Sequence, residues 1–270
     1  MLLAVDIGNT NTVLGVFRDS KLLLHWRLTT QRDRTSDEYG ILCRNLFSLW
    51  DLDRKKISAV VVSSVVPPVN PLIREMTQEY FGLLPFFVDP AEQNLIPVRY
   101  NPITDVGADR IVNAVAAVER YGKPVVVIDF GTATTFDVVS PEGAYVGGLI
   151  APGLNISAEA LFARAARLPR VEVRRTEQII GTSTVESIQS GLFHGYVSLV
   201  NGLVQLIVEQ VPGARIVATG GLADSLVPDI PAVQHVDQDL TLEGLRIFYE
   251  RVFKRSEAVQ SAGEGPGLGI

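Results

Sequence analysis

The stretch Asp6-Ile-Gly-Asn-Thr-Asn-Thr12 follows a short apolar run, and Asp129-Phe-Gly-Thr-Ala-Thr-Thr135 repeats its pattern in the second half of the chain. In each motif an aspartate ends a strand, and the glycine lets the backbone turn tightly. The amides and hydroxyls that follow can donate hydrogen bonds to phosphate oxygens. One copy alone would be typical of an Asx turn in a β-hairpin. Two copies at matching places predict a phosphate-binding site.

The segments around the two motifs repeat as well. The first motif is flanked by strand patterns at 2–5 and 13–17, the second by strand patterns at 125–128 and 135–140. Each half continues with a third strand and then alternating helices and strands. This internal repeat predicts two duplicated α/β lobes with mixed sheets flanked by helices and a nucleotide cleft between them. The expected boundaries are 1–121 and 122–255, with a flexible tail over 256–270.

Hydrophobic periodicity and capping signals place the remaining elements. Thr35 and Glu38 have the spacing of a capping box, which predicts a helix from there to about Leu49. Further helices are expected at 70–81, 111–121, 154–167, 185–211 and 242–254, and further strands at 21–28, 57–66, 86–89, 145–150, 215–218 and near Val233. The segment 217–222 follows a strand and opens a helix, where small residues would let an adenosine approach the backbone.

Composition limits the classes of function. A formal charge of −6 and a pI near 5.2 argue against nucleic acid and anionic membrane surfaces as partners. The single cysteine, Cys43, cannot form an internal disulfide. The chain enters a strand without a secretory leader, and no segment approaches the ~18 continuous apolar residues of a membrane span. We expect a cytoplasmic enzyme that acts on small molecules.

Four segments together resemble type III pantothenate kinase, a family within the acetate and sugar kinase, Hsp70 and actin superfamily. They are Asp6-Ile-Gly-Asn-Thr-Asn, Gly107-Ala-Asp-Arg110, Asp129-Phe-Gly-Thr-Ala-Thr and Gly147-Gly-Leu-Ile-Ala-Pro-Gly153. The resemblance implies two RNase H-like, actin-like ATPase lobes. It also implies ATP-dependent phosphorylation of pantothenate to 4′-phosphopantothenate, the first step toward coenzyme A, by a homodimer that needs K⁺ or NH₄⁺.

The resemblance assigns roles to individual residues. The ATP site would comprise Asp6, Ile7, Gly8, Asn9, Thr10, Asn11, Thr12, Val13 and, from the second motif, Thr132. The pantothenate site would comprise Tyr100, Gly107, Ala108, Asp109, Arg110 and Thr184. Asp129 would ligate the monovalent cation, and Asp109 would be the catalytic base. Because two aspartates near a polyphosphate repel it, we also infer Mg²⁺ bound with the ATP.

Asp109 can be judged on physical grounds too. It precedes an apolar-periodic helix, whose amino terminus stabilises an ionised carboxylate able to accept a hydrogen bond from a substrate hydroxyl. A helix cap paired with Arg110 is the structural alternative, and Asp105 is a second candidate base. Arg110 could hold the pantothenate carboxylate or form an ion pair, and Thr184 could cap the helix that follows it.

Two other functions fit the repeated motifs. One is another small-metabolite kinase on the same scaffold, such as a sugar kinase. The other is an actin-like regulatory protein that uses ATP as a conformational switch.

Overall fold

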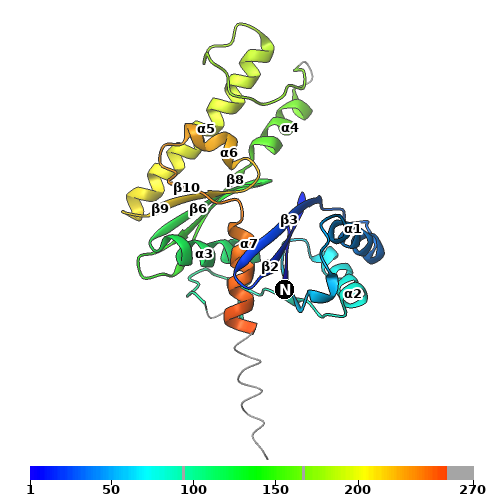
Figure 1. Cartoon of the computed structure of the whole chain (residues 1–270). Helices are drawn as coiled ribbons and strands as arrows, with labels where there is room; N and C mark the ends of the chain where they lie inside the picture. The colour runs from blue at the N-terminus through cyan, green and yellow to red at the C-terminus, as the bar shows by residue number, and fades with distance from the viewer. Residues whose placement is uncertain (93–94, 166–167, 254–270) are drawn as a thin grey trace, which may run out of the picture. The chain divides into compact units, whose positions relative to one another are not determined.

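The structure, a computed structural model, describes residues 1–92, 95–165 and 168–253 of the 270-residue chain. This part of the chain forms two compact units, Met1–Ala116 with the segment that begins at Leu240, and Ala117–Asp239. Each unit contains a five-stranded sheet with helices beside it (Figure 1). The predicted tail, 256–270, lies outside the described residues.

The first sheet has the strand order β3-β2-β1-β4-β5. Its strands are β1 (Leu2–Ile7), β2 (Asn11–Arg18), β3 (Lys21–Thr29), β4 (Ala59–Ser64) and β5 (Phe86–Phe87). The first three form an antiparallel meander, whereas β4 and β5 run parallel to β1. The predicted strand 57–66 thus becomes the central β4, whose first five residues are buried on both faces, as expected for a parallel strand.

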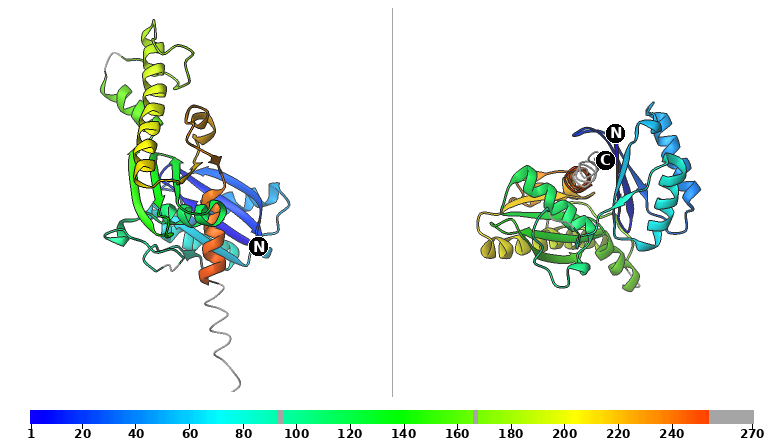
Figure 2. Two further views of the ribbon diagram at one scale, coloured as in Figure 1. Left: turned by 90° about the vertical axis from the view of Figure 1, so that its left-hand side faces the viewer. Right: turned by 90° about the horizontal axis from the view of Figure 1, so that it is seen from below.

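Helices cover both faces of this sheet. On one face, α1 (Ser36–Leu49) and α2 (Asn70–Phe81) pack side by side (Figure 2). The core beneath them includes Val5, Val62 and Met76. The remaining helices of this unit are α3 (Ala108–Tyr121), which continues into the second unit, and α7 (Leu240–Phe248).

The sequence pattern assigns the carboxyl-terminal helix to the second lobe, but α7 packs on β1, β2 and β4 of the first sheet. Its contact with β2 is close because Gly15 has no side chain, and a Cβ there would lie 2.8 Å from Leu242 Cδ1. Gly244 similarly lies against the backbone of Val112 in α3. Periodicity identifies the apolar face of α7 but not the sheet that this face covers.

The second sheet repeats the design, with the order β10-β9-β6-β7-β8. Its strands are β6 (Val125–Phe130), β7 (Ala133–Val139), β8 (Tyr145–Pro152), β9 (Arg215–Thr219) and β10 (His235–Val236). The helices of this unit are α4 (Leu154–Arg164), α5 (Thr184–Gln210) and α6 (Ala223–Leu226). As in the first sheet, an antiparallel meander is followed by parallel strands.

Short helical turns complete the described elements. They are 3₁₀ turns at Arg54–Lys56, Pro67–Val69, Ile103–Asp105 and Val227–Asp229, and a π-helical turn at Tyr249–Phe253.

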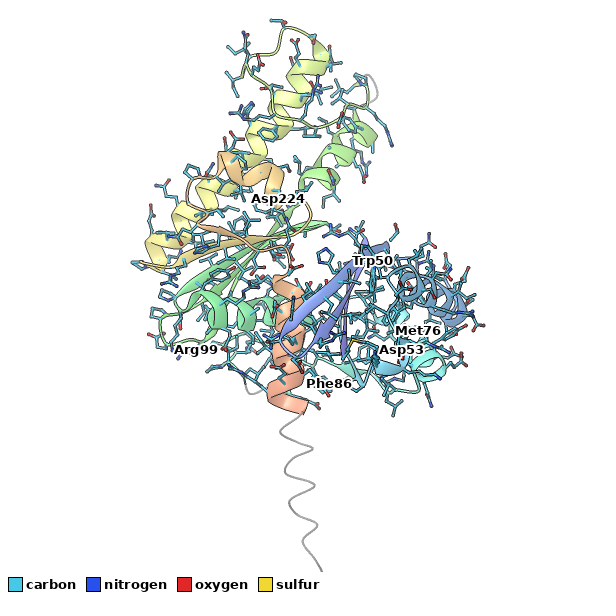
Figure 3. All side chains as sticks on the ribbon, in the orientation of Figure 1. Trp50, Asp53, Met76, Phe86, Arg99 and Asp224 are labelled. Carbon is cyan, nitrogen blue, oxygen red and sulfur yellow. The ribbon has the colours of Figure 1, made fainter. Side chains whose placement is uncertain are left out.

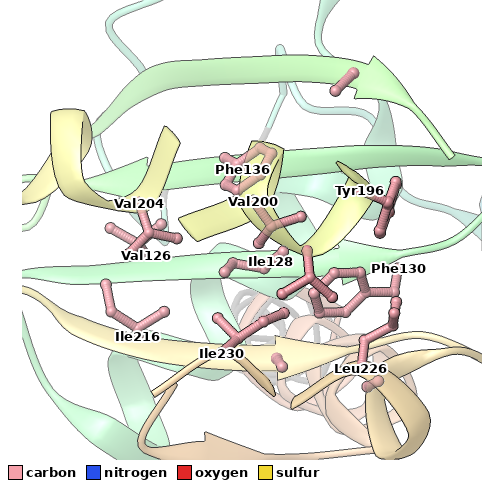
Figure 4. Packing of buried hydrophobic residues seen from close by; sticks show 14 of the residues in the cluster. Val126, Ile128, Phe130, Phe136, Tyr196, Val200, Val204, Ile216, Leu226 and Ile230 are labelled. Carbon is pink, nitrogen blue, oxygen red and sulfur yellow. The ribbon is translucent and has the colours of Figure 1, made fainter. Parts of the chain in front are cut away.

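The second core lies between the sheet and α5. Tyr196, Val200 and Val204 of α5 pack over Ile128 and Phe136 of the central strands (Figure 4). The ends of this unit are joined by Asp237, which accepts a 2.8 Å hydrogen bond from the Tyr121 hydroxyl and pairs with Arg120 at 3.0 Å. Burial and the neighbouring Asp237 carboxylate raise the pKa of Tyr121 to about 12.

We expected no segment to approach the apolar length of a membrane span, and by the criteria of length and composition this expectation is wrong. Among the described residues, α5 alone is long and apolar enough to cross a membrane, with a mean hydropathy of 1.4 over a stretch of which 33% is buried. Scattered glycine, serine and amide residues hide this from a search for a continuous apolar run, yet its only Asp, Glu, Lys or Arg residues are Glu186 and Glu209. One side of α5 belongs to the core described above.

The predicted capping box at α1 is confirmed. The Thr35 hydroxyl accepts the Glu38 amide at 3.3 Å, and the Glu38 carboxylate accepts the Thr35 amide at 2.7 Å. The only two tryptophans of the chain, Trp26 and Trp50, both belong to the first unit, and Trp50 lies at the end of α1 (Figure 3).

We expect Thr35→Ala to lower the free energy of unfolding of the first unit by about 1 kcal/mol, because the Glu38 amide at the helix start loses its side-chain acceptor. Thr35→Ser keeps the hydroxyl and should change it little. Urea unfolding followed by tryptophan fluorescence measures this unit directly. Equal losses in the two variants would contradict the capping role.

Candidate active site

The Asp6 motif forms the turn between β1 and β2. The Gly8 amide donates to the Asn11 carbonyl at 2.9 Å, which closes the hairpin and leaves Asn9 and Thr10 exposed at its tip. Asp6 itself pairs with Val13 across the ladder, at the carboxyl end of the central strand β1. The tip therefore presents backbone amides and two polar side chains to solvent, an arrangement able to bind an anion.

The Asp129 motif forms the equivalent turn between β6 and β7. The Gly131 amide donates to the Ala133 carbonyl at 3.2 Å, and Thr132 is exposed at the tip. Here a second segment covers the turn, because the Gly153 amide donates to the Thr132 carbonyl at 3.2 Å. A Cβ at Gly153 would lie 2.7 Å from the Gly131 carbonyl oxygen, so only glycine allows this approach.

Asp129 lies between the ends of two parallel strands. It pairs with Thr219 of β9, and Gly220, which has a φ of 92°, follows directly. A Cβ at Gly220 would collide with the Asp129 carboxylate and would lie 2.7 Å from the Phe130 amide nitrogen. The glycine thus keeps open the space beside the Asp129 carboxylate, as expected where a ligand or ion approaches the backbone.

Asp109 lies in the first turn of α3, next to the end of the first hairpin. Val65 links the two places: its amide donates to the Ile7 carbonyl at 3.0 Å, and a Cβ at Gly107 would lie 3.4 Å from Val65 Cγ1 and 2.5 Å from Asp109 Oδ1. The Asp109 carboxylate also accepts the Arg110 amide at 2.8 Å. The first unit therefore brings the Asp6 hairpin and Asp109 to the same edge of its sheet.

Burial dominates the electrostatics of Asp109. Removal from water raises the pKa of its carboxyl, while the Arg110 amide and the Arg110 guanidinium oppose the rise. The helix amino terminus, the one effect on this carboxyl that the sequence indicates, acts in the lowering direction. The net direction, upward, is typical of carboxylates that serve as bases rather than of simple helix caps.

The other predicted acceptor residues differ in their surroundings. Arg110 is buried, Tyr100 is half-buried and Asp105 is exposed. Thr184 is the first residue of α5, but the cap is Ser183, whose hydroxyl accepts the Glu186 amide. Thr184 is exposed in a pocket of about 640 Å³ formed by α4, α5 and the segment before α5.

The predicted residues therefore fall into two sets, one in each unit. Asp6 to Val13, Tyr100 and Gly107 to Arg110 belong to the first unit, whereas Asp129, Thr132 and Thr184 belong to the second. No group of three or more histidine, cysteine or acidic side chains suited to a metal occurs in the described part of the chain.

Two features of the hairpins had no clear sequence signal. Gly153 ends a motif used in the resemblance, but nothing in the pattern indicated that it lies against Thr132. Thr30 was not singled out, although its hydroxyl donates to the Gly8 carbonyl at 2.8 Å and its amide donates to the Thr10 carbonyl at 2.9 Å. The three-stranded meander was the only indication, because it returns the end of β3 to the hairpin.

Two mixed sheets of the same topology, each with an Asp-Gly hairpin at the end of its central strand, define an ATPase-type protein of the actin-like fold. Comparison with known proteins narrows this class. The family model of type III pantothenate kinase matches residues 2–206.

Two curated relatives have that same name. The Koribacter versatilis enzyme is 51% identical over 262 residues, covering 93% of this chain and 96% of the relative. The Myxococcus xanthus enzyme is 54% identical over 252 residues, covering 93% and 98%. The chain belongs to the type III pantothenate kinase family.

Solved structures support the fold. A Campylobacter jejuni protein, assigned to the Baf family of transcriptional activators, superimposes with a TM-score of 0.59 at 18% identity, covering 93% of this chain and 99% of that one. Component A of (R)-2-hydroxyglutaryl-CoA dehydratase from Acidaminococcus fermentans gives 0.55 at 12% identity, covering 95% and 98%. At such identities the likeness concerns architecture alone.

The raised pKa of Asp109 gives a stability prediction with a definite sign. The folded state holds the proton more tightly than the unfolded state, so stability falls as pH rises from the unfolded value near 4 through the folded pKa. Asp109→Asn cannot ionise and should be more stable than the wild type at neutral pH. Melting temperatures across pH should show this difference shrinking toward low pH.

Asp105→Asn, at an exposed aspartate of the same segment, is the matched control and should shift the melting curves little. A wild-type protein more stable than Asp109→Asn at neutral pH would mean that the ionised carboxylate is stabilised in the fold.

Proposed function

We propose that this protein transfers the terminal phosphoryl group of ATP to the primary hydroxyl of pantothenate, giving 4′-phosphopantothenate, the first step toward coenzyme A. One observation carries the proposal: the chain is 51% and 54% identical in sequence to two type III pantothenate kinases, over 93% of its length. The position of Asp109 beside the Asp6 hairpin agrees with it.

In this proposal Asp109 is the catalytic base. Phosphoryl transfer is usually loose, so the hydroxyl proton leaves late and the carboxylate mainly orients the nucleophile. Burial makes Asp109 a stronger base than an exposed aspartate, because its raised pKa increases its affinity for the proton. Asp105 is the weaker candidate because it is exposed and its carboxylate contacts the neighbouring Thr104 hydroxyl.

The two hairpins would bind ATP. Asp6 to Val13 would contact the polyphosphate through the amides and side chains of the exposed tip, and Thr132 would contact it from the second hairpin. The glycines support this role, since Gly8 closes its turn and leaves the amides of the tip to a ligand. Both assignments rest on the motif match together with this geometry.

Cations would complete the site. The Asp129 carboxylate, next to Thr219 and the space kept open at Gly220, would supply the oxygen ligands that suit K⁺ or NH₄⁺. Mg²⁺ would be held mainly by the ATP phosphates and water, which agrees with the lack of a clustered ligand set in the described ranges. Such cations neutralise charge on the phosphoryl oxygens during transfer.

The acceptor would be held by Tyr100, Gly107 to Arg110, and Thr184. Burial favours Arg110 for a planar, two-point contact with the pantothenate carboxylate, because a guanidinium retains its charge in such surroundings. Thr184 lies in a pocket that is lined by hydroxyl-bearing residues and by the aliphatic side chains of Leu161, Ile188 and Leu192. That mixture suits a small molecule with both polar and aliphatic parts.

We propose that the protein is a cytoplasmic homodimer whose two subunits contact each other through the outer face of α5. This face exposes Leu199 and Leu206, and a groove of about 480 Å³ runs between them. Among the described residues, a Cβ at Gly195 or Gly202 would face open space, so another helix could approach closely. A second copy of α5 supplies the matching apolar surface.

The activity test is an ADP-release assay with ATP and Mg²⁺. We expect turnover that requires pantothenate, increases with K⁺, and falls in Asp109→Asn by about 10² to 10⁴ in kcat. Asp105→Asn is the control and should retain most activity. Hydrolysis without an acceptor, unaffected at Asp109, would instead favour the regulatory ATPase, and turnover with a sugar would favour a sugar kinase.

The dimer is tested by sedimentation velocity. Leu206→Glu places a charge on the apolar face of α5 and should yield monomers, whereas Leu84→Glu changes an exposed leucine of the first unit and should not. A Leu206→Glu protein that sediments like the wild type would contradict an interface at this face.

A further inference from the structure

The connection between β3 and α1, residues 30–35, lies against the first hairpin. Thr30 makes three contacts there: its amide donates to the Thr10 carbonyl at 2.9 Å, and its hydroxyl lies 2.8 Å from both the Gly8 carbonyl and the Thr12 hydroxyl. Thr12 is buried, so this network is partly shielded from water. The start of the connection is thereby fixed to the turn that closes the hairpin.

The rest of the connection is fixed as well. The Tyr39 hydroxyl donates to the Gln31 carbonyl at 3.0 Å, and Arg34 donates to the Gln31 side chain at 2.9 Å. The Arg34 guanidinium lies over the Tyr39 ring, 5.2 Å from its centroid. The capping box at Thr35 holds the far end. Residues on both sides of Arg32 are thus anchored while its own side chain is exposed.

Arg32 points at the tip of the hairpin. Its Nη2 lies 3.4 Å from Asn9 Oδ1, and Asn9 is one of the two exposed tip residues. The hairpin segment 6–13 contains one aspartate and no basic residue, although it would have to attract a polyphosphate with several negative charges. A guanidinium at this position supplies the missing positive charge and several donors.

We propose that Arg32 is a further ATP-binding residue, which contacts the polyphosphate beside Asn9, and that Thr30 is the positioning residue that holds Arg32 at the hairpin. The proposal rests on the proposed role of the Asp6 hairpin in ATP binding. Its simplest rival is a surface hydrogen bond between Arg32 and Asn9 with no part in ligand binding, which would contribute little energy at an exposed site.

The charge of Arg32 makes the two roles separable. If Arg32 contacts the polyphosphate, its loss weakens the binding of ligands that carry phosphates. The binding of adenosine, which has no phosphate, stays unchanged. The contact is exposed, so salt should screen it: the Debye length falls from about 14 Å near 0.05 M to about 4 Å near 0.5 M. A hydrogen bond internal to the apo protein predicts neither pattern.

The experiment is isothermal titration of the full-length protein with ATP, ADP and adenosine. We expect Arg32→Gln to weaken ATP and ADP binding about threefold to tenfold, leave adenosine unchanged, and lose its effect at high NaCl with K⁺ held constant. Arg32→Lys should fall between. Arg18→Gln is the matched control, since Arg18 is exposed at the opposite end of β2, roughly 23 Å from the tip.

Thr30 is tested by the pair Thr30→Val and Thr30→Ser. Valine keeps the shape but removes the hydroxyl that fixes the hairpin, so KM for ATP should rise while KM for pantothenate stays unchanged. Serine restores the hydroxyl and should restore KM for ATP. A valine variant that lowers kcat alone, or a serine variant that fails to rescue, would overturn the positioning role.

Asp6→Asn separates the two levels of the proposal. ATP binding that changes in Asp6→Asn but not in Arg32→Gln would refute Arg32 and leave the hairpin site intact. Binding that changes in neither variant would refute the hairpin site, and with it the role of Arg32. Tryptophan fluorescence, which reports the first unit, confirms that each variant is folded.

Discussion

The hydrogen bond that closes the Asp6 hairpin, and its equivalent in the Asp129 hairpin, set the geometry on which the candidate site depends. Gly8 to Asn11 in one unit and Gly131 to Ala133 in the other fix the register between the first two strands. That register places each aspartate at the carboxyl end of a central strand, exposes the polar tip, and leaves the opposite edge of the same strand to a parallel partner. A slip of one residue would turn each aspartate toward the core.

Local patterns in the sequence predicted local structure well. The duplicated hairpins, the Thr35 capping box and the core helices α1, α2 and α5 are confirmed with shifts of a few residues at their ends. Long-range packing was less accessible: periodicity identifies the apolar stripe of α7 but not the sheet that it covers. The close approaches at Gly15 and Gly244 belong to its packing on the first unit. The cap of α5 was a local error, since Ser183 and Glu186 have the capping spacing that Thr184 lacks.

The candidate site was predicted in composition but not in environment. The sequence locates Asp109 at a helix start, yet its pKa depends on how much water the fold removes from it, and that burial is a property of the three-dimensional packing. Thr30 and Arg32 were not predicted for a related reason, because neither belongs to a motif. The meander returns the end of β3 to the hairpin, where Thr30 contacts Gly8 and Arg32 contacts Asn9. The roles of individual residues in binding and transfer stay predictions.

The placement of α7 affects how the chain folds during synthesis. The second unit is a continuous segment, Ala117–Asp239, whose two ends are joined through Asp237. The first unit, in contrast, lacks its helix α7 until the residues from Leu240 onward have left the ribosome. The order of completion is therefore the reverse of the order of translation. Until then, Gly15 and the strand face around it lack their cover, so the nascent first unit exposes apolar surface that the finished protein buries under α7.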